Sequence, residues 1–340
     1  MKINISRNQL KNYIIFLHIV FVIIGIYIFF YNYSLSESLL VQKTFSQQAI
    51  LSRSGANSIK DFFQNVENQL FSFGVSLEKT DESSPIDRTG VRLAFQAFFQ
   101  KSTSPINEIA LYDETGKLLV IENRERITTG EGQDFSDRDF IIWSKNSLNS
   151  NKVFIASSYT AKAGSSVGKN IIVFASPFYF GTKYKGTMTI RVLLDKFQAA
   201  FINPLNPGID ENAFIVDTDG YLRAGQENLI NKNLISYANE TKWENYQDFL
   251  NKFQQSIKKN DIQTAWDFQN PKEKSPKTLL VSVSRIDVPN TDKDLSLIIT
   301  IPKDSVSSSI SNLRYFGTAW LGLGLFTTIL GSIVIIMLKE

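Results

Sequence analysis

The stretch EIALYDETGKLLV (Glu108–Val120) has a counterpart in AFIVDTDGYLRAG (Ala213–Gly225). Each copy predicts an apolar strand, an Asp-x-x-Gly turn and a second strand, because aspartate and glycine favour tight turns between extended segments. The turn aspartates Asp113 and Asp217 lie 104 residues apart. A repeat at this spacing predicts two similar modules of about a hundred residues each.

A second matching pair of stretches follows the first in each half of the chain. NIIVFASPFYFGTKYKGTMTIRVLLD (Asn170–Asp195) corresponds to TLLVSVSRIDVPNTDKDLSLIITIPKD (Thr278–Asp304). In both, a polar turn separates two runs rich in β-branched and aromatic residues, so each half supplies about four strands in two hairpins. We therefore expect an α+β fold of two tandem modules with antiparallel sheets, over residues 81–200 and 201–302.

A long amphipathic pattern precedes the modules. Within residues 33–80, thirteen positions recur at steps of three and four, and all but Gln42 and Ser52 are apolar. No proline interrupts the pattern before Pro85, so it predicts one long helix that carries both modules. Two helices broken at Gly55 are the alternative, although a glycine costs a helix only about 1 kcal/mol.

Two apolar stretches, residues 13–31 and 316–338, flank this region and contain no Asp, Glu, Lys or Arg. Each is long enough to cross a bilayer as a helix, which takes about 20 residues. The second follows a short amphipathic juxtamembrane helix predicted over residues 303–315. For the first stretch a cleaved signal peptide is the alternative, but residues 31–33, Tyr-Asn-Tyr, offer no small-residue cleavage site.

The basic residues predict an orientation in the membrane. Lys2, Arg7 and Lys11 precede the first stretch, whereas residues 32–42 contain no Lys or Arg. Because basic residues stay on the cytoplasmic side, residues 1–12 are expected in the cytoplasm. A two-pass protein of the cell (inner) membrane follows, with both termini cytoplasmic and the two modules in the periplasm or outside the cell.

The composition excludes several kinds of chemistry. The chain has no cysteine and one histidine, His18, which lies within the first apolar stretch and there is either a proton relay or bonded to a neighbouring helix. Disulfides, thiolate or histidine-rich metal centres and Ser-His triads are therefore excluded. A net charge of +3 does not indicate a nucleic-acid partner. We expect no catalytic residue, no metal and no cofactor, and therefore no enzyme.

The order of a span, a long helix, two PAS-like modules and a second span resembles the double Cache sensor domains of bacterial and archaeal transmembrane receptors. The most specific local feature is FSDRDF (Phe135–Phe140), followed by FIASSY, IIVFASPFY and KGTMTIRVLLDKF, which look like successive strands of that family. The resemblance covers residues 35–312. It implies a signal-transduction sensor in which a small ligand binds the membrane-distal module, residues 81–200, and shifts the second transmembrane helix.

The resemblance also implies site residues. In family members that bind amino acids, an arginine and aromatic residues hold the ligand carboxylate, and a strand aspartate holds the ammonium. Here Arg138 matches the arginine, Tyr159 matches a strand tyrosine, and Arg191 falls where the aspartate is expected. The candidate ligand-binding residues are Phe135, Arg138, Phe140, Trp143, Tyr159 and Arg191.

Two arginines in one site favour an anion. Guanidinium groups bind carboxylates and phosphates in a bidentate fashion and repel an ammonium, so we expect an organic acid or another anion as the ligand. The alternatives are that Arg138 pairs with Asp137 or Asp139 or caps a neighbouring loop, and that Arg191 points to solvent. The aromatic residues would then belong to the hydrophobic core.

The segment AGSSVGKN (Ala163–Asn170) is close to a phosphate-binding loop. That motif needs a helix after the loop, whose N-terminal amides hold phosphate. Here a strand-like run follows, so the segment is expected to be a hairpin loop.

The expected partners are a small-molecule ligand, membrane lipid, a second copy of the chain and a cytoplasmic or membrane signalling protein. A small-residue face of Gly324, Thr328 and Ser332 supports a homodimer. Because the sequence given ends at Glu340, it is either the sensor half of a chemoreceptor, histidine kinase or diguanylate cyclase, or a free-standing sensor. The rival functions are a membrane-anchored binding or adhesion module without signalling, and an extracytoplasmic hydrolase.

Overall fold

The computed structural model describes residues 7–78, 86–101, 105–156, 158–206, 212–226, 229–240, 246–258, 262–268, 277–288, 290–291, 294–308, 315, 317–319, 322–324 and 326–331. The chain divides into two compact units. One comprises Met1–Gln47 and Pro302–Glu340, and the other is Gln48–Ile301.

The long helix α1 is continuous from Arg7 to Glu78, which confirms the prediction of one long N-terminal helix. The helix does not break at Gly55. A Cβ atom at this position would lie 2.7 Å from Leu205 Cδ1 and 2.8 Å from Leu297 Cδ2. Gly55 therefore permits close packing of α1 against its neighbours, which is a different role from the helix break considered from the sequence.

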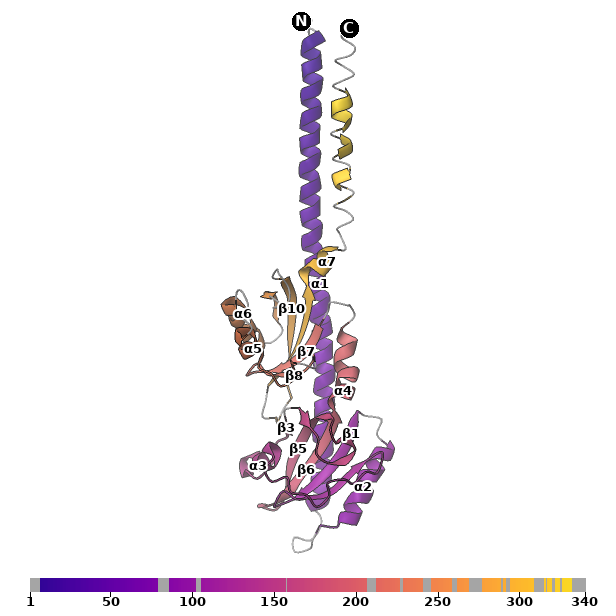
Figure 1. The fold of residues 1–340 in the computed structure, drawn as a ribbon, viewed down its shortest axis with the longest axis vertical. Helices are drawn as coiled ribbons and strands as arrows, with labels where there is room; N and C mark the ends of the chain where they lie inside the picture. The colour runs from indigo at the N-terminus through magenta and orange to yellow at the C-terminus, as the bar shows by residue number, and fades with distance from the viewer. Residues whose placement is uncertain are drawn as a thin grey trace. The chain divides into compact units, whose positions relative to one another are not determined.

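The first module forms one antiparallel sheet with strand order β2-β1-β6-β5-β3, and β4 also pairs with β5 (Figure 1). Short helices lie between the strands, as expected for an α+β module. Its elements are α2 (Arg88–Lys101), β1 (Ile106–Asp113), β2 (Leu118–Asn123), α3 (Asp139–Ser144), η1 (Ser147–Asn149), β3 (Phe154–Ile155), β4 (Tyr159–Thr160), η2 (Gly164–Ser166), β5 (Asn170–Phe180) and β6 (Lys183–Leu193).

The second module repeats this arrangement with strand order β8-β7-β11-β10-β9. In both sheets the first hairpin lies beside the last strand, which confirms the predicted repeat. The sheets are larger than the four strands expected from each half, because edge strands β3, β4 and β9 add to them. The connection from the first sheet to the second contains α4 (Leu194–Phe197), η3 (Gln198–Ile202) and η4 (Asn203–Leu205). The elements of the second module are β7 (Asn212–Asp217), β8 (Leu222–Ala224), α5 (Leu234–Glu240), α6 (Tyr246–Lys258), β9 (Ile262–Phe268), β10 (Lys277–Ile286) and β11 (Leu295–Pro302), followed by α7 (Lys303–Ser308).

The sheet of the first module is buried on two faces. One face, here called the α1 face, packs against α1 and α2 in a large apolar cluster that includes Ile109 and Ile190. The other, here called the α3 face, packs beneath α3 in a separate cluster that includes Ala110 and Tyr112. Consecutive strand residues therefore point into two different interiors.

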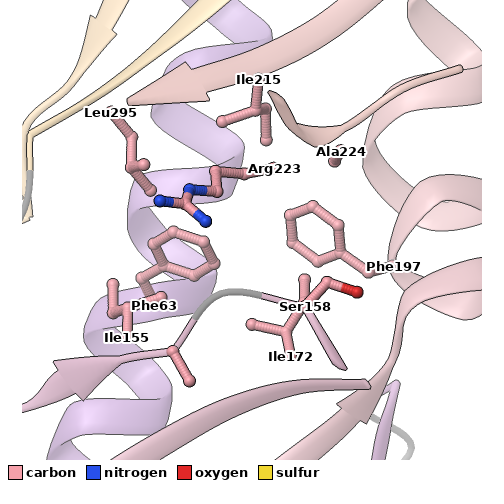
Figure 2. Close-up of a pocket in the computed structure, with 10 residues that line it drawn as sticks. Phe63, Ile155, Ser158, Ile172, Phe197, Ile215, Arg223, Ala224 and Leu295 are labelled. Carbon is pink, nitrogen blue, oxygen red and sulfur yellow. The ribbon is translucent and has the colours of Figure 1, made fainter. Parts of the chain in front are cut away.

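A pocket lies where the two modules meet beside α1 (Figure 2). Its lining is mainly apolar, with Phe63 from α1, Ile155 and Phe197 from one side and Leu295 from the other. The guanidinium group of Arg223 also lines it. The junction between the modules is therefore an apolar contact that includes the long helix.

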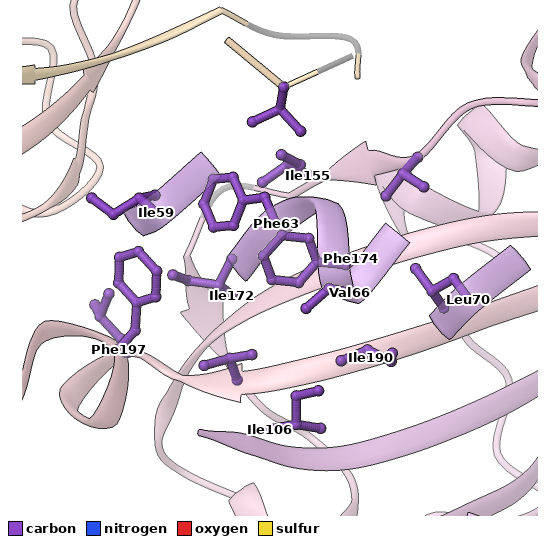
Figure 3. Packing of buried hydrophobic residues seen from close by; sticks show 14 of the residues in the cluster. Ile59, Phe63, Val66, Leu70, Ile106, Ile155, Ile172, Phe174, Ile190 and Phe197 are labelled. Carbon is purple, nitrogen blue, oxygen red and sulfur yellow. The ribbon is translucent and has the colours of Figure 1, made fainter. Parts of the chain in front are cut away.

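Aromatic rings pack α1 against the first module at this junction (Figure 3). The ring centroid of Phe63 lies 5.1 Å from that of Phe174 in β5 and 5.9 Å from that of Phe197 in α4. Phe63 is 3% exposed. Burial of such a ring contributes several kilocalories per mole to stability, so the junction is a major site of packing energy.

One polar residue of α1 breaks the apolar pattern and is nevertheless buried. Ser52 is 0% exposed, and its hydroxyl lies 3.0 Å from the hydroxyl of Ser282 and 2.9 Å from that of Ser284, both in β10. A buried hydroxyl needs a partner, and here the second sheet supplies it. The exception in the sequence pattern is thus a specific contact between α1 and the second module.

The flanking spans remain predictions. Helix α1 contains an apolar window with a mean hydropathy of 2.3, long enough to cross a membrane by length and composition. Of the second predicted span, the residues described between Gly317 and Gly331 are apolar and mainly helical. Residues 309–314 and 332–340, including Ser332 of the small-residue face, lie outside the described residues.

The packing of Phe63 predicts a large effect of truncation. Phe63→Ala should lower the free energy of unfolding by about 3–5 kcal/mol, because it removes a buried ring and leaves a cavity. Ile50→Ala is the control, since Ile50 lies on the same helix and is 70% exposed; its effect should stay below about 0.5 kcal/mol. Chemical denaturation of the full chain in lipid nanodiscs, followed by circular dichroism, measures both. Equal effects of the two substitutions would contradict this packing.

Candidate ligand-binding site

The α3 face carries charged and polar side chains on two neighbouring strands. In the register of β1 and β6, Glu108 lies opposite Arg191 and Ala110 lies opposite Thr189. Side chains two residues apart on a strand share a face, so Glu108, Ala110 and Tyr112 point the same way. The fold therefore places the carboxylate of Glu108 beside the guanidinium group of Arg191 on the buried α3 face of the sheet.

Arg191 and Glu108 form a buried ion pair. Their side chains are 3% and 0% exposed, and Arg191 Nη1 lies 3.1 Å from Glu108 Oε2. The same nitrogen donates to the carbonyl oxygen of Ala163, 3.2 Å away, and Nη2 donates to the hydroxyl of Tyr112. Arg191 is therefore paired, so the prediction of a second uncompensated cation in the site is wrong. The alternative that Arg191 points to solvent is also wrong.

The other oxygen of Glu108 is held by the loop that resembles a phosphate-binding loop. Oε1 accepts hydrogen bonds from the Ser166 amide at 2.8 Å and from Ser165 Oγ at 3.0 Å. Gly164 has φ +79°, and a Cβ atom there would lie 2.2 Å from the same oxygen. The loop therefore binds a carboxylate of its own chain, and glycine is required for its close approach.

Arg138 lies directly before α3 and above the ring of Tyr159. Its guanidinium carbon is 5.0 Å from the ring centroid, a cation–π contact. Asp139 Oδ1 accepts from the Phe140 amide at 2.8 Å, and no carboxylate among the described residues pairs with Arg138. Arg138 Nη2 is buried and has no hydrogen-bond partner in this part of the structure. Arg138 therefore carries a positive charge that no described carboxylate neutralises.

Burial controls the protonation of the neighbouring groups. Burial raises the pKa of Tyr159 well above its usual value, against the opposing effect of the positive charges of Arg191 and Arg138. Burial tends to lower the pKa of Arg191, but Tyr112 and Glu108 raise it above its usual value. At neutral pH Tyr159 is consequently an uncharged hydroxyl, whereas Arg191 remains charged.

The aromatic candidates divide into two groups. The ring centroid of Tyr112 lies 5.7 Å from that of Phe135 and 5.5 Å from that of Phe140, in edge-to-face contacts. Trp143 instead packs on Phe154 of β3, with 5.3 Å between the centroids. The fold thus brings Phe135, Arg138, Phe140, Tyr159 and Arg191 together with Tyr112, while Trp143 covers the adjoining strand.

Several buried polar atoms on and above the α3 face lack partners among the described residues. Besides Ser144 Oγ of α3 itself, they include Arg138 Nη2, Arg191 Nε and Thr189 Oγ1. Thr189 lies between Ala110 and Ala175 on the neighbouring strands, two residues before Arg191. Buried polar groups normally have hydrogen-bond partners, so these atoms indicate where a bound ligand would accept hydrogen bonds.

Sequence reasoning missed Glu108 and Tyr112. Both lie in the first quoted stretch, EIALYDETGKLLV, as polar residues at alternate positions of an otherwise apolar strand. This alternation is the signal that could have placed them on one face with Arg191. Their pairing with Arg191 requires the register between β1 and β6, which a single sequence does not supply.

The strand segment that carries Tyr159 is bonded to the second module on both sides. This linking segment comprises residues 153–156 and 158–160. The Val153 amide donates to the carbonyl oxygen of Asn290 at 2.8 Å, and Asn231 Nδ2 donates to the carbonyl oxygen of Ser158. Asn290 Nδ2 in turn donates to Glu67 Oε1 of α1 at 2.8 Å. The linking segment therefore connects the α3 face with α1 and the second module.

The pocket at the junction of the modules has a different character. Its arginine, Arg223, forms an ion pair with Asp217, which is 1% exposed, and the Nε atom donates to Asp217 Oδ2 at 2.8 Å. The remaining lining is mainly apolar (Figure 2). This pocket therefore offers no uncompensated charge to an ionic ligand.

The buried ion pair predicts a strong dependence of stability on Glu108. Glu108→Ala should lower the free energy of unfolding by about 3–5 kcal/mol, because it leaves the Arg191 charge buried without a partner. The control is Glu114→Ala in the exposed turn after β1, with an expected change below about 0.5 kcal/mol. Urea denaturation of both variants as full chains in nanodiscs gives the comparison. A Glu108→Ala variant as stable as the control would show that the ion pair does not form.

Solved structures show the same fold. No family model and no curated protein matches the sequence. The ligand-binding domain of the Pseudomonas fluorescens chemoreceptor CtaA in complex with L-isoleucine aligns with a TM-score of 0.56 at 15% identity, covering 81% of this chain and 98% of that one. The periplasmic sensory domain of a Campylobacter jejuni chemoreceptor aligns with a TM-score of 0.61 at 14% identity, covering 78% and 98%.

A third structure is the ligand-binding domain of the Pseudomonas aeruginosa PAO1 amino acid chemoreceptor PctC in complex with GABA. It aligns with a TM-score of 0.53 at 14% identity, covering 76% of this chain and all (100%) of that one. The chain therefore has the double Cache fold of periplasmic sensory domains.

Proposed function

We propose that the chain is a transmembrane sensor that binds a small organic acid, or another small anion, at the α3 face of its first module. The observation that carries this proposal is Arg138, whose guanidinium group stacks on Tyr159, has a buried atom without a partner and is not neutralised by a described carboxylate. Solved domains of the same fold form complexes with L-isoleucine and with GABA. Those ligands support a small molecule as the signal.

The chemistry of the site favours a carboxylate. A guanidinium group forms short, charge-assisted hydrogen bonds with carboxylate oxygens, often two at once. Arg138 supplies the charge and Tyr159 supplies a neutral hydroxyl, while Phe135 and Phe140 with Tyr112 form an apolar wall. An anion with a small apolar part suits this combination of groups.

The proposed topology follows the charge pattern of the sequence. Residues 13–31 within α1 cross the membrane from the cytoplasm, and residues 316–338 return to it. The two modules, residues 81–200 and 201–302, then lie in the periplasm or outside the cell. A homodimer with adjacent spans is the proposed assembly, because small residues in the second span permit close approach of two helices.

The linking segment is the proposed route of the signal. A ligand that draws Arg138 and Tyr159 together moves the segment whose Val153 amide is bonded to Asn290. Asn290 lies between β10 and β11, and β11 continues through Pro302 into α7. Ligand binding drives this movement only to the extent that it favours one of two conformations over the other.

Replacement of Arg138 tests the ligand site. We expect short carboxylates to raise the melting temperature of the full chain in nanodiscs, since a ligand stabilises the state that it binds. Arg138→Ala should abolish the shift, and Arg138→Lys should retain part of it because the charge remains while the planar fork is lost. Arg126→Ala, at an exposed position, should leave it intact. A shift that survives Arg138→Ala, or one produced only by amines, would contradict the proposal.

A second experiment separates a sensor from an anchored binding module. The chain contains no cysteine, so Leu323→Cys provides a single crosslinking site in the predicted second span. The carboxylate with the largest thermal shift should change the rate of disulfide formation between copies. Asn290→Gly should weaken this response while binding persists, because glycine tolerates the φ of 59° at this position and the substitution removes the side-chain bond to Glu67.

The control for this experiment is Asn151→Gly at an exposed position, which should respond as the parent does. A crosslinking rate that the ligand leaves unchanged in the parent chain would favour the anchored binding or adhesion module. An Asn290→Gly variant with the full response would show that the signal does not use this contact.

A further inference from the structure

We propose that the α3 face selects monocarboxylates that lack an amine, and rejects both amino acids and dicarboxylates, because the Glu108–Arg191 pair leaves a single uncompensated positive charge. This inference rests on the proposed function and specifies its ligand. It also separates this chain from the solved domains whose complexes contain L-isoleucine and GABA.

The first step is the balance of charge at the site. Arg138 and Arg191 are positive and Glu108 is negative, while Tyr112 and Tyr159 are uncharged hydroxyls. Asp139 is exposed, and its Oδ1 accepts a hydrogen bond from the amide at the start of α3. Water screens such an exposed charge, so the described interior of the site carries a net charge of one, which a single carboxylate neutralises.

The second step concerns an ammonium group. Both oxygens of Glu108 are already engaged, Oε1 by Ser165 and Ser166 and Oε2 by Arg191. An ammonium could reach this carboxylate only by displacing Arg191, which would leave a guanidinium group buried without its partner. Removing one partner of a buried ion pair costs about 3–5 kcal/mol. An amino acid therefore loses affinity relative to the same acid without the amine.

The third step concerns a second carboxylate. The charge of Arg191 is compensated by Glu108, and only its Nε atom remains without a partner among the described residues. The Nε–H group suits a neutral acceptor better than a second carboxylate. The negative charge of that carboxylate would be buried without a counter-charge, which is costly. A dicarboxylate would place one of its two charges in this position and bind more weakly.

The buried donors that lack partners favour a ligand with an additional oxygen near its carboxylate. Arg191 Nε donates one hydrogen bond, and the hydroxyl of Thr189 on the same face of β6 donates or accepts one. Thr189 is buried, and the residues beside it on the neighbouring strands, Ala110 and Ala175, are small. A hydroxyl or keto oxygen of a short acid matches these groups, and the aromatic rings match its apolar part.

Two matched pairs of compounds test the inference on the full chain in nanodiscs by isothermal titration calorimetry. L-lactate and L-alanine differ by a hydroxyl in place of an ammonium, and propionate and succinate differ by one carboxylate. We expect L-lactate to bind at least about tenfold more tightly than L-alanine, and propionate at least about tenfold more tightly than succinate, which corresponds to about 1.4 kcal/mol. Equal or reversed affinity in either pair overturns the inference.

The outcomes also distinguish this inference from the proposed function. Carboxylate binding that depends on Arg138, combined with equal affinity for L-alanine and L-lactate, refutes the selectivity and leaves the sensor intact. Binding of none of the four compounds overturns the selectivity, and a thermal-shift panel without any carboxylate response overturns the function as well.

A charge variant adds a second measurement. Glu108→Gln keeps the shape of the side chain but removes the charge that compensates Arg191, so the succinate-to-propionate affinity ratio should rise at least about tenfold, again about 1.4 kcal/mol. Glu114→Gln at the exposed turn should leave the ratio unchanged. An unchanged ratio in a folded Glu108→Gln variant contradicts the role of the pair, and the wild-type comparison decides the matter if this variant does not fold.

Discussion

Alternation of side chains along the strands of the first module divides them between two buried interiors, and the rest of the structure depends on this division. Ile109 and Ile190 point into the cluster formed with α1, whereas Tyr112 and Arg191 point toward α3. A ligand that rearranges the α3 face therefore acts on a sheet whose other face is packed on α1. Densely packed interiors transmit such strain because they compress little.

The buried Glu108–Arg191 pair shows why a site of this kind carries polar groups. Such a pair adds little net stability relative to well-packed apolar residues, because both charges lose their hydration. Its proposed contribution is to fix the charge that a ligand would meet. The hydroxyl of Tyr112 and the loop around Ser166 complete the hydrogen bonds of both partners, so in the proposed site Arg138 alone supplies an uncompensated charge.

The sequence predicted the parts of the fold that depend on periodic patterns. The repeat around Asp113 and Asp217 and the long stretch of α1 follow from hydrophobic spacing, which reports on each element by itself. The hydrophobic pattern did not include the edge strands β3, β4 and β9, because two of them are only two residues long and the third contains alternating polar residues. For β3 and β4 only the resemblance of FIASSY to a family strand pointed to extended structure. In the sequence alone, Gly55 and Ser52 interrupt the pattern of an apolar helix. Their packing against Leu205 and Leu297 and against the serines of β10 explains both residues.

The site was harder to predict because it depends on contacts between distant segments. Arg138, Phe135 and Tyr159 were proposed as site residues through the resemblance to known sensor domains. Glu108 lies 83 positions from Arg191 in sequence, and only the strand register reveals that the two side chains meet. The loop at Ala163–Asn170 has the composition of an anion site, yet it binds a carboxylate of its own chain.

The central claim is that a ligand at the α3 face changes the second module through the linking segment. Hydrogen–deuterium exchange of the full chain in nanodiscs, with and without saturating L-lactate, tests it most directly. The account predicts slower exchange at the amides of Asp139–Ser144 and at residues 158–160, together with a change at Asn290 and in β11. Protection confined to the second module, or to the pocket lined by Phe197 and Leu295, would contradict it.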